Sequence, residues 1–144
     1  MRNCCLILIS SLFLFTSCQK EESQSEYVSR SYEEVKDYFI TFDTIFDLEI
    51  DFYYVYFFSY QCVHCNNIKN EMIDYALNYK DMYFCHFESS FPRCEDKNYS
   101  LVGLTSVDDI CLVGTPELFK IKNKTIIDYM LGEQEIMFEI NNSN

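Results

Sequence analysis

The chain has 144 residues, of which 49% are hydrophobic and 17% aromatic, and its formal net charge is −12. This length and composition suit one globular domain with its own core. The acidic balance argues against the Lys- and Arg-rich surfaces that bind nucleic acid or anionic lipid, so we expect no nucleic-acid partner. Eight cysteines are many for a chain kept in a reducing compartment, which favours export.

The first seventeen residues have the pattern of a signal peptide, because a basic start is followed by an apolar run over residues 5–15. That run is too short for a membrane-spanning helix. It ends in Phe-Thr-Ser-Cys, which resembles the end of a bacterial lipoprotein signal. The resemblance implies that Cys18 is acylated and anchors an extracytoplasmic lipoprotein to the membrane. The alternative is an ordinary secretory signal that leaves a secreted protein.

Three segments follow from this interpretation. Residues 1–17 form the signal peptide, and residues 18–30 comprise the lipidated cysteine and a polar, flexible tether. Residues 31–144 form the folded domain. Its first signal is a capping box at Ser31 and Glu34, which predicts a helix over 32–46.

The middle of the domain predicts a strand, a helix and a second strand. The apolar run 50–58, IDFYYVYFF, is typical of a central strand buried on both faces. An amphipathic pattern predicts a helix over 63–79, and MYFCHF over 82–87 predicts the next strand. Consecutive strands joined by a helix are expected to be parallel.

The last third predicts mainly a hairpin. Residues 88–106 have the composition of a loop, and a short helix is expected near Ser106. The segments 117–122 and 125–131, separated by Asn-Lys, predict a β-hairpin, and an amphipathic pattern predicts a helix over 133–140.

Two motifs define a candidate site. Cys62-Val-His-Cys65 follows the apolar strand, and Gly-Thr115-Pro116 precedes the hairpin. A βαβ unit followed by a ββα unit, with these motifs at these places, resembles the thioredoxin fold. The resemblance implies an α/β domain with a central mixed sheet flanked by helices. It also implies a cis-proline at Pro116 that faces the cysteines, with Thr115 and Pro116 contacting the substrate chain.

The cysteine spacing indicates thiol–disulfide exchange. A thiolate is the attacking species, and a helix N-terminus beside Cys62 would favour its thiolate. Cys65, one turn along, reaches the same sulfur. We therefore expect Cys62 to be the nucleophile and Cys65 the resolving thiol of a redox-active disulfide, with no dissociable cofactor and no metal.

His64 and Tyr56 bear on the direction of exchange. A histidine before the second cysteine resembles the motif of bacterial disulfide-bond oxidases, which implies that His64 stabilises the Cys62 thiolate. The position of the buried acid of thioredoxin is Tyr56, which argues against efficient reduction. Oxidase, isomerase and reductase therefore remain alternatives. The expected partners are proteins with thiols or disulfides and a redox partner protein.

Other uses of the cysteines stay open at this point. A bridge between Cys85 and Cys94 is possible, as are buried free thiols. A zinc or copper module is a further alternative, in which the metal would be held by Cys62 and Cys65 of the motif together with Cys85, Cys94, His64 and His86. A third possibility is a non-catalytic accessory protein of this fold that serves secretion or peptide maturation.

Overall fold

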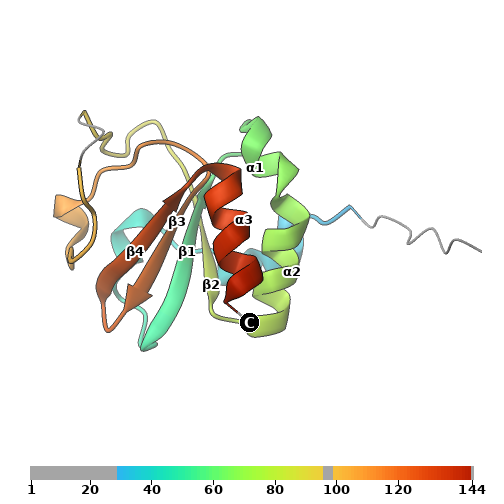
Figure 1. The fold of residues 1–144 in the computed structure, drawn as a ribbon, viewed down its shortest axis with the longest axis horizontal. Coiled ribbons are helices and arrows are strands. Elements are labelled where there is room, and N and C mark those ends of the chain that lie inside the picture. The colour runs from blue at the N-terminus through green and yellow to red at the C-terminus, as the bar shows by residue number, and fades with distance from the viewer. Residues whose placement is uncertain (1–28, 96–98, 144) are drawn as a thin grey trace, which may run out of the picture.

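The computed structural model describes residues 29–95 and 99–143, so the expected signal peptide and Cys18 lie outside the described residues. These residues form one four-stranded sheet with helices on it (Figure 1). In chain order the elements are η1 (Tyr32–Tyr38), η2 (Phe42–Thr44), β1 (Phe52–Phe58), α1 (Val63–Asn67), α2 (Lys69–Tyr79), β2 (Met82–His86), η3 (Val107–Asp109), β3 (Glu117–Lys122), β4 (Thr125–Leu131) and α3 (Gly132–Asn142), where η marks 3₁₀-helix.

The apolar run forms β1, the strand around which the sheet is built. The strand order is β2-β1-β3-β4, with β1 parallel to β2 and antiparallel to β3, and β3 antiparallel to β4. Six of the seven β1 residues are buried because both faces of the strand are covered. This is the topology of the thioredoxin fold, which confirms the expected fold class and both predicted hairpin strands.

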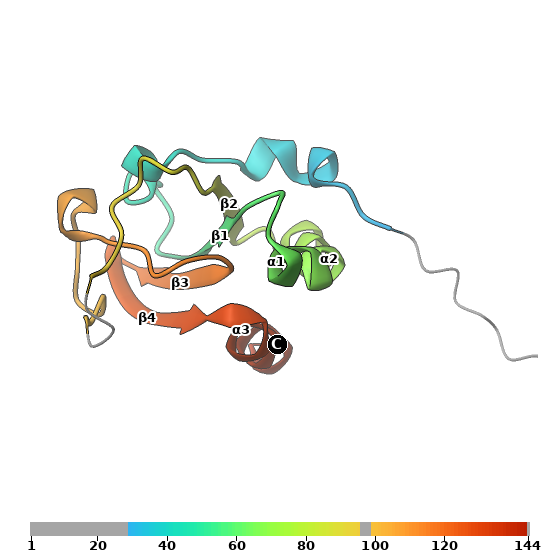
Figure 2. The same cartoon turned by 90° about the horizontal axis from the view of Figure 1, so that it is seen from above.

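The α-helices cover one face of the sheet. Alternation along β1 directs Tyr54, Tyr56 and Phe58 to this face, where they join the buried side chains of α1, α2 and α3. Figure 2 shows the three α-helices on the same side of the sheet. Cys65 belongs to this core and is fully buried. The second cysteine of the motif is therefore shielded by the sheet behind it.

Loops and 3₁₀ turns cover the opposite face. Tyr53, Val55 and Phe57 of β1 pack there against side chains of the segments that connect the strands. Ile110 and Leu112, which precede the Thr115-Pro116 motif, are buried in this second core. The connection into β3 is thus anchored on the sheet before it reaches the cysteines.

The predicted helix over 32–46 is wrong beyond its first turns. The capping box at Ser31 is present and starts η1, which has non-helical dihedral angles at Val35. Phe39 then pairs with Phe84 in an isolated parallel bridge at the edge of β2, and the Ile40 N–H donates to the Phe84 carbonyl at 3.0 Å. This pairing gives hydrogen-bond partners to backbone groups at the edge of β2, which is why the chain is extended here despite its helical pattern.

The predicted helix over 63–79 is two helices. The backbone at Ile68 has φ −109° and ψ 8°, which separates α1 from α2, while the Ile68 side chain is buried in the core beneath the α-helices.

The closing helix α3 extends beyond its predicted end. No helix among the described residues is long and apolar enough to cross a membrane.

Candidate active site

The two cysteines lie where β1 ends and α1 begins. Cys62 is the N-cap of α1, and its sulfur accepts the backbone N–H of Cys65 at 3.2 Å. Both cysteines are free thiols; Cys62 is half-buried and Cys65 buried. An accessible Cys62 and a buried Cys65 suit the expected roles of nucleophile and resolving thiol.

The loop before β3 brings Thr115 to the same sulfur. Because β3 is antiparallel to β1 and Glu117 pairs with Phe57, the start of β3 lies beside the end of β1. The Thr115–Pro116 peptide bond is cis. The Cys62 thiol donates to the Thr115 carbonyl at 3.3 Å, across 53 positions of sequence. The structure therefore brings together the two motifs that define the candidate site.

The surroundings of Cys62 favour its thiolate. Burial by itself raises the pKa of this thiol, but several hydrogen bonds together outweigh burial and lower the pKa. They come from the Cys65 thiol, the Thr115 side chain and the backbone N–H groups of Cys65 and His64. A lowered pKa increases the fraction of the attacking species at neutral pH.

Cys65 has the opposite character. Burial, and then the hydrogen bond with Cys62, raise the pKa of Cys65 to about 12. Cys65 is therefore a protonated thiol while Cys62 is available for attack. Two thiols one turn apart with opposite pKa shifts are what sequential attack and resolution require.

His64 contacts Cys62 by its main chain rather than its ring. The backbone N–H lowers the Cys62 pKa, whereas the imidazole Nδ1 lies 3.3 Å from Glu133 Oε2 on α3. The His64 side chain is 66% exposed. Stabilisation of the thiolate by the imidazole thus remains a prediction, and the ring contact that the structure provides is with an acid.

Tyr56, the residue six positions before Cys62, lies in the same buried core as Cys65. The hydroxyls of Tyr56 and Tyr32 are buried. Burial, and then the neighbouring Cys65, raise the pKa of Tyr56. A neutral phenol with a raised pKa is a poor base, so Tyr56 is not suited to take the proton from Cys65.

Glu117 is a polar residue near the site that the sequence analysis missed. Its side chain is fully buried, Oε2 accepts the Val113 N–H at 3.1 Å, and Oε1 has no hydrogen-bond partner among the described residues. A charged residue at the start of ELFKIK is typical of an exposed strand end. The available signal was alternation, since Glu117 shares its face with Phe119 and Ile121.

The disulfide of the described residues joins Cys94 to Cys111, and of the two alternatives left open for Cys85 the buried free thiol is the one observed. A Cys85–Cys94 bridge is therefore wrong. The reason is a local pairing: Arg93 and Leu112 form a parallel bridge, and the Cys94 N–H donates to the Leu112 carbonyl at 3.1 Å. Cys85, on β2, instead packs into the core on the loop-covered face.

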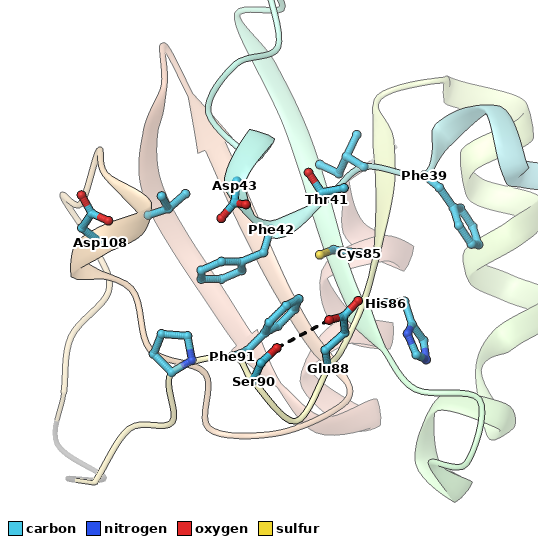
Figure 3. Close-up of a pocket in the computed structure, with 13 residues that line it drawn as sticks. Phe39, Thr41, Phe42, Asp43, Cys85, His86, Glu88, Ser90, Phe91 and Asp108 are labelled. Carbon is cyan, nitrogen blue, oxygen red and sulfur yellow. Dashed lines mark hydrogen bonds between the residues drawn. The ribbon is translucent and has the colours of Figure 1, made fainter.

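The structure separates the remaining candidate metal ligands. Cys85 lines a cavity of about 770 Å³ together with His86, Glu88 and a facing pair of rings, Phe42 and Phe91 (Figure 3). This cavity does not include Cys62 or Cys65. Within residues 29–95 and 99–143, no three His, Cys, Asp or Glu side chains are grouped so that they could hold a metal ion.

Comparisons with known proteins give structural similarity only. No protein-family model matches the sequence, and no curated protein matches it. Among solved structures, thioredoxin f2 of Chlamydomonas reinhardtii is 17% identical, with a TM-score of 0.49 over 74% of this chain and 94% of that one. A thioredoxin of Plasmodium falciparum is 18% identical, with a TM-score of 0.47 over 74% and 98%. Spinach chloroplast thioredoxin f is 14% identical, with a TM-score of 0.48 over 79% and 95%.

Proposed function

We propose that this chain is a thiol–disulfide oxidoreductase that exchanges protein disulfides through Cys62 and Cys65. The observation that carries the proposal is the placement of two free thiols at one helix start, where the half-buried Cys62 sulfur accepts the N–H of the buried Cys65 and faces the Thr115 carbonyl. The contact of the Thr115 carbonyl with the Cys62 sulfur supports a substrate-binding role for Thr115 and Pro116, because the loop backbone would align an extended peptide with Cys62.

The exchange has two displacement steps. The Cys62 thiolate attacks one sulfur of a substrate disulfide, forms a mixed disulfide and releases the other substrate sulfur as a thiolate. Cys65 then loses its proton and attacks the Cys62 sulfur, which releases the second substrate thiolate. The products are a Cys62–Cys65 disulfide and a substrate dithiol, after the released thiolates take up protons. The reverse sequence oxidises a substrate dithiol.

The direction of exchange depends on the reduction potential of the pair. Each ~1.4 kcal/mol of stabilisation of the reduced form makes the disulfide ~30 mV more oxidising. The lowered Cys62 pKa and the absence of an acid at Tyr56 favour the oxidase or isomerase direction. Its partners would be secreted proteins with thiols or disulfides, and a second redox protein that resets the pair.

We further propose that the enzyme works outside the cytoplasm, tethered to the membrane through lipid on Cys18. The support is the sequence of residues 1–18 and the cysteine content. Several acyl chains, at ~0.8 kcal/mol per buried CH₂, would anchor it stably. Labelling with a fatty acid tests this proposal, because Cys18→Ala should remove the label and retention of label would contradict it.

Two isosteric variants test the exchange chemistry. With an oxidised dithiol peptide as the probe, Cys65→Ser should accumulate the mixed disulfide on Cys62, because no thiol remains to resolve it. Its matched control, Cys62→Ser, should form none, since Cys65 is buried and protonated. Mass spectrometry identifies the linked cysteine. Trapping on Cys65 would reverse the roles, and trapping on neither would refute the function.

A further inference from the structure

Glu117 lies directly after the cis-proline and holds the loop that faces Cys62. Its Oε2 accepts the Val113 N–H at 3.1 Å, and the neighbouring Gly114 N–H helps to lower the pKa of this carboxyl, which burial raises. The next residue along, Thr115, places its carbonyl on the Cys62 sulfur. A continuous chain of contacts therefore runs from the buried carboxyl through the loop backbone to the nucleophile.

Other contacts hold the two ends of the same loop. The Cys94–Cys111 disulfide and the Arg93–Leu112 bridge fix residues 111–112, while Pro116 accepts the Gly132 N–H at 2.9 Å. The stretch 113–115 lacks backbone pairing to a strand, and the Val113 N–H bonds instead to the Glu117 carboxyl. The carboxyl thus takes the place of a neighbouring strand for this stretch.

We propose that Glu117 is the positioning residue of the loop 113–116, and that its ionised carboxylate holds Thr115 against Cys62 more tightly than the protonated acid does. A carboxylate accepts stronger hydrogen bonds from backbone N–H groups than a neutral acid does. The consequence for disulfide exchange rests on the proposed function, whereas the effect on the loop does not.

The surroundings of the carboxyl allow this change near neutral pH. Burial raises the pKa of Glu117 to about 7, and the bonds from Val113 and Gly114 limit the rise. Its partners across the sheet, Phe57 on β1 and Leu131 on β4, carry no charge. On the loop side, Cys111 is in the disulfide and does not titrate. These partners of Glu117 therefore offer no opposite charge to its carboxylate.

The loop itself is the primary readout. In the reduced wild-type protein, the amide proton shifts of Val113 and Gly114 should titrate with a midpoint near pH 7, and their hydrogen-exchange protection should be about tenfold greater above it than below, after correction for intrinsic exchange. In Glu117→Gln both effects should vanish. The matched control is Glu135→Gln, since Glu135 accepts the Leu131 N–H four residues back but is exposed.

Exchange activity is the second readout. Relative to wild type, Glu117→Gln should resolve and form mixed disulfides about tenfold more slowly above pH 7 and at similar rates well below it, while Glu135→Gln should match wild type throughout. Loop amides that keep their full protection in Glu117→Gln would overturn the positioning role. Wild-type loop amides that do not titrate near pH 7 would overturn its dependence on ionisation, and the wild-type titration decides this even if the variant fails to fold. Loop amides that titrate in a protein without exchange activity would instead refute the proposed function alone.

Discussion

Thr115 contacts the reacting sulfur by both its main chain and its side chain. Its carbonyl accepts the Cys62 thiol proton in the reduced state, whereas its side chain lowers the pKa of both Cys62 and Cys65. The carbonyl bond disappears when the thiol ionises, and the side-chain bond then remains. The hydroxyl is therefore the part of this residue that favours the thiolate.

Thr115→Val tests this assignment, because valine keeps the branched shape and removes the hydroxyl. We expect the Cys62 pKa to rise by roughly one unit, which corresponds to a hydrogen bond to a charged group of about 1.4 kcal/mol. The thiolate absorbance of the reduced protein, followed across pH, gives the midpoint. An unchanged midpoint would mean that the Cys65 thiol and the backbone N–H groups activate Cys62 without the hydroxyl.

His64→Ala separates the ring from the backbone. Alanine keeps the N–H that bonds to Cys62 and removes the imidazole that lies beside Glu133. Because that contact is on the exposed surface, we expect the same titration to show a Cys62 pKa within about 0.3 units of wild type. A rise of a unit or more would instead establish the imidazole as the tuning group, as the sequence motif implied.

At the scale of elements, β1 and the β3–β4 hairpin could be predicted because their sequence patterns are local. An unbroken apolar run requires cover on both faces, and the two strands of the hairpin flank a short polar turn. The break at Ile68 has no such signal, since isoleucine is compatible with a helix and its neighbours are polar. The bridge at Phe39 depends on the edge of β2, which is distant in sequence.

The site divides in the same way. The two motifs could be found because cysteine spacing and a Thr-Pro pair are local patterns, and the fold brings them together. The Cys94–Cys111 pairing and the carboxyl of Glu117 could not, because each depends on how the loop from 88 to 116 lies on the sheet. No short-range pattern in that segment fixes its path.

The Cys94–Cys111 disulfide should contribute to stability through the loop that it closes. For a separation of 17 residues, the loss of the cross-link is expected to cost about 3 kcal/mol, because the unfolded chain gains conformational freedom. Urea denaturation of the double variant Cys94→Ser, Cys111→Ser measures the loss. Wild type under reducing conditions is the control and should unfold at a similar midpoint. Equal stability of the oxidised wild type and the variant would contradict the expectation.

Across the whole sequence, acidic groups far outnumber basic ones, and most of the acidic side chains among the described residues are exposed. Glu117 differs because it is the only acidic or basic residue that is buried among the described residues. It lies between the sheet and the loop that carries the proposed substrate contacts. A single buried carboxyl should therefore leave a distinct signature in the pH dependence of global stability.

The sign of that signature follows from the raised pKa. The usual value of 4.5 applies to the unfolded chain, and burial raises the folded value to about 7, so folding takes up a proton between these two pH values. The contribution of Glu117 to the free energy of unfolding is complete below about pH 4.5 and falls as the pH rises to about 7. At ~1.4 kcal/mol per unit, the loss is on the order of 3 kcal/mol.

Glu117→Gln removes this dependence, because an amide does not titrate. We expect wild type to lose roughly 3 kcal/mol relative to the variant between pH 4.5 and 7, and the difference to stay constant above that range. Urea denaturation at a series of pH values measures both proteins, and subtraction removes the titration of the exposed acids that they share. Glu135→Gln, whose carboxyl is exposed, should follow wild type at every pH. Parallel curves for wild type and Glu117→Gln would show that this carboxyl has an ordinary pKa in the folded protein.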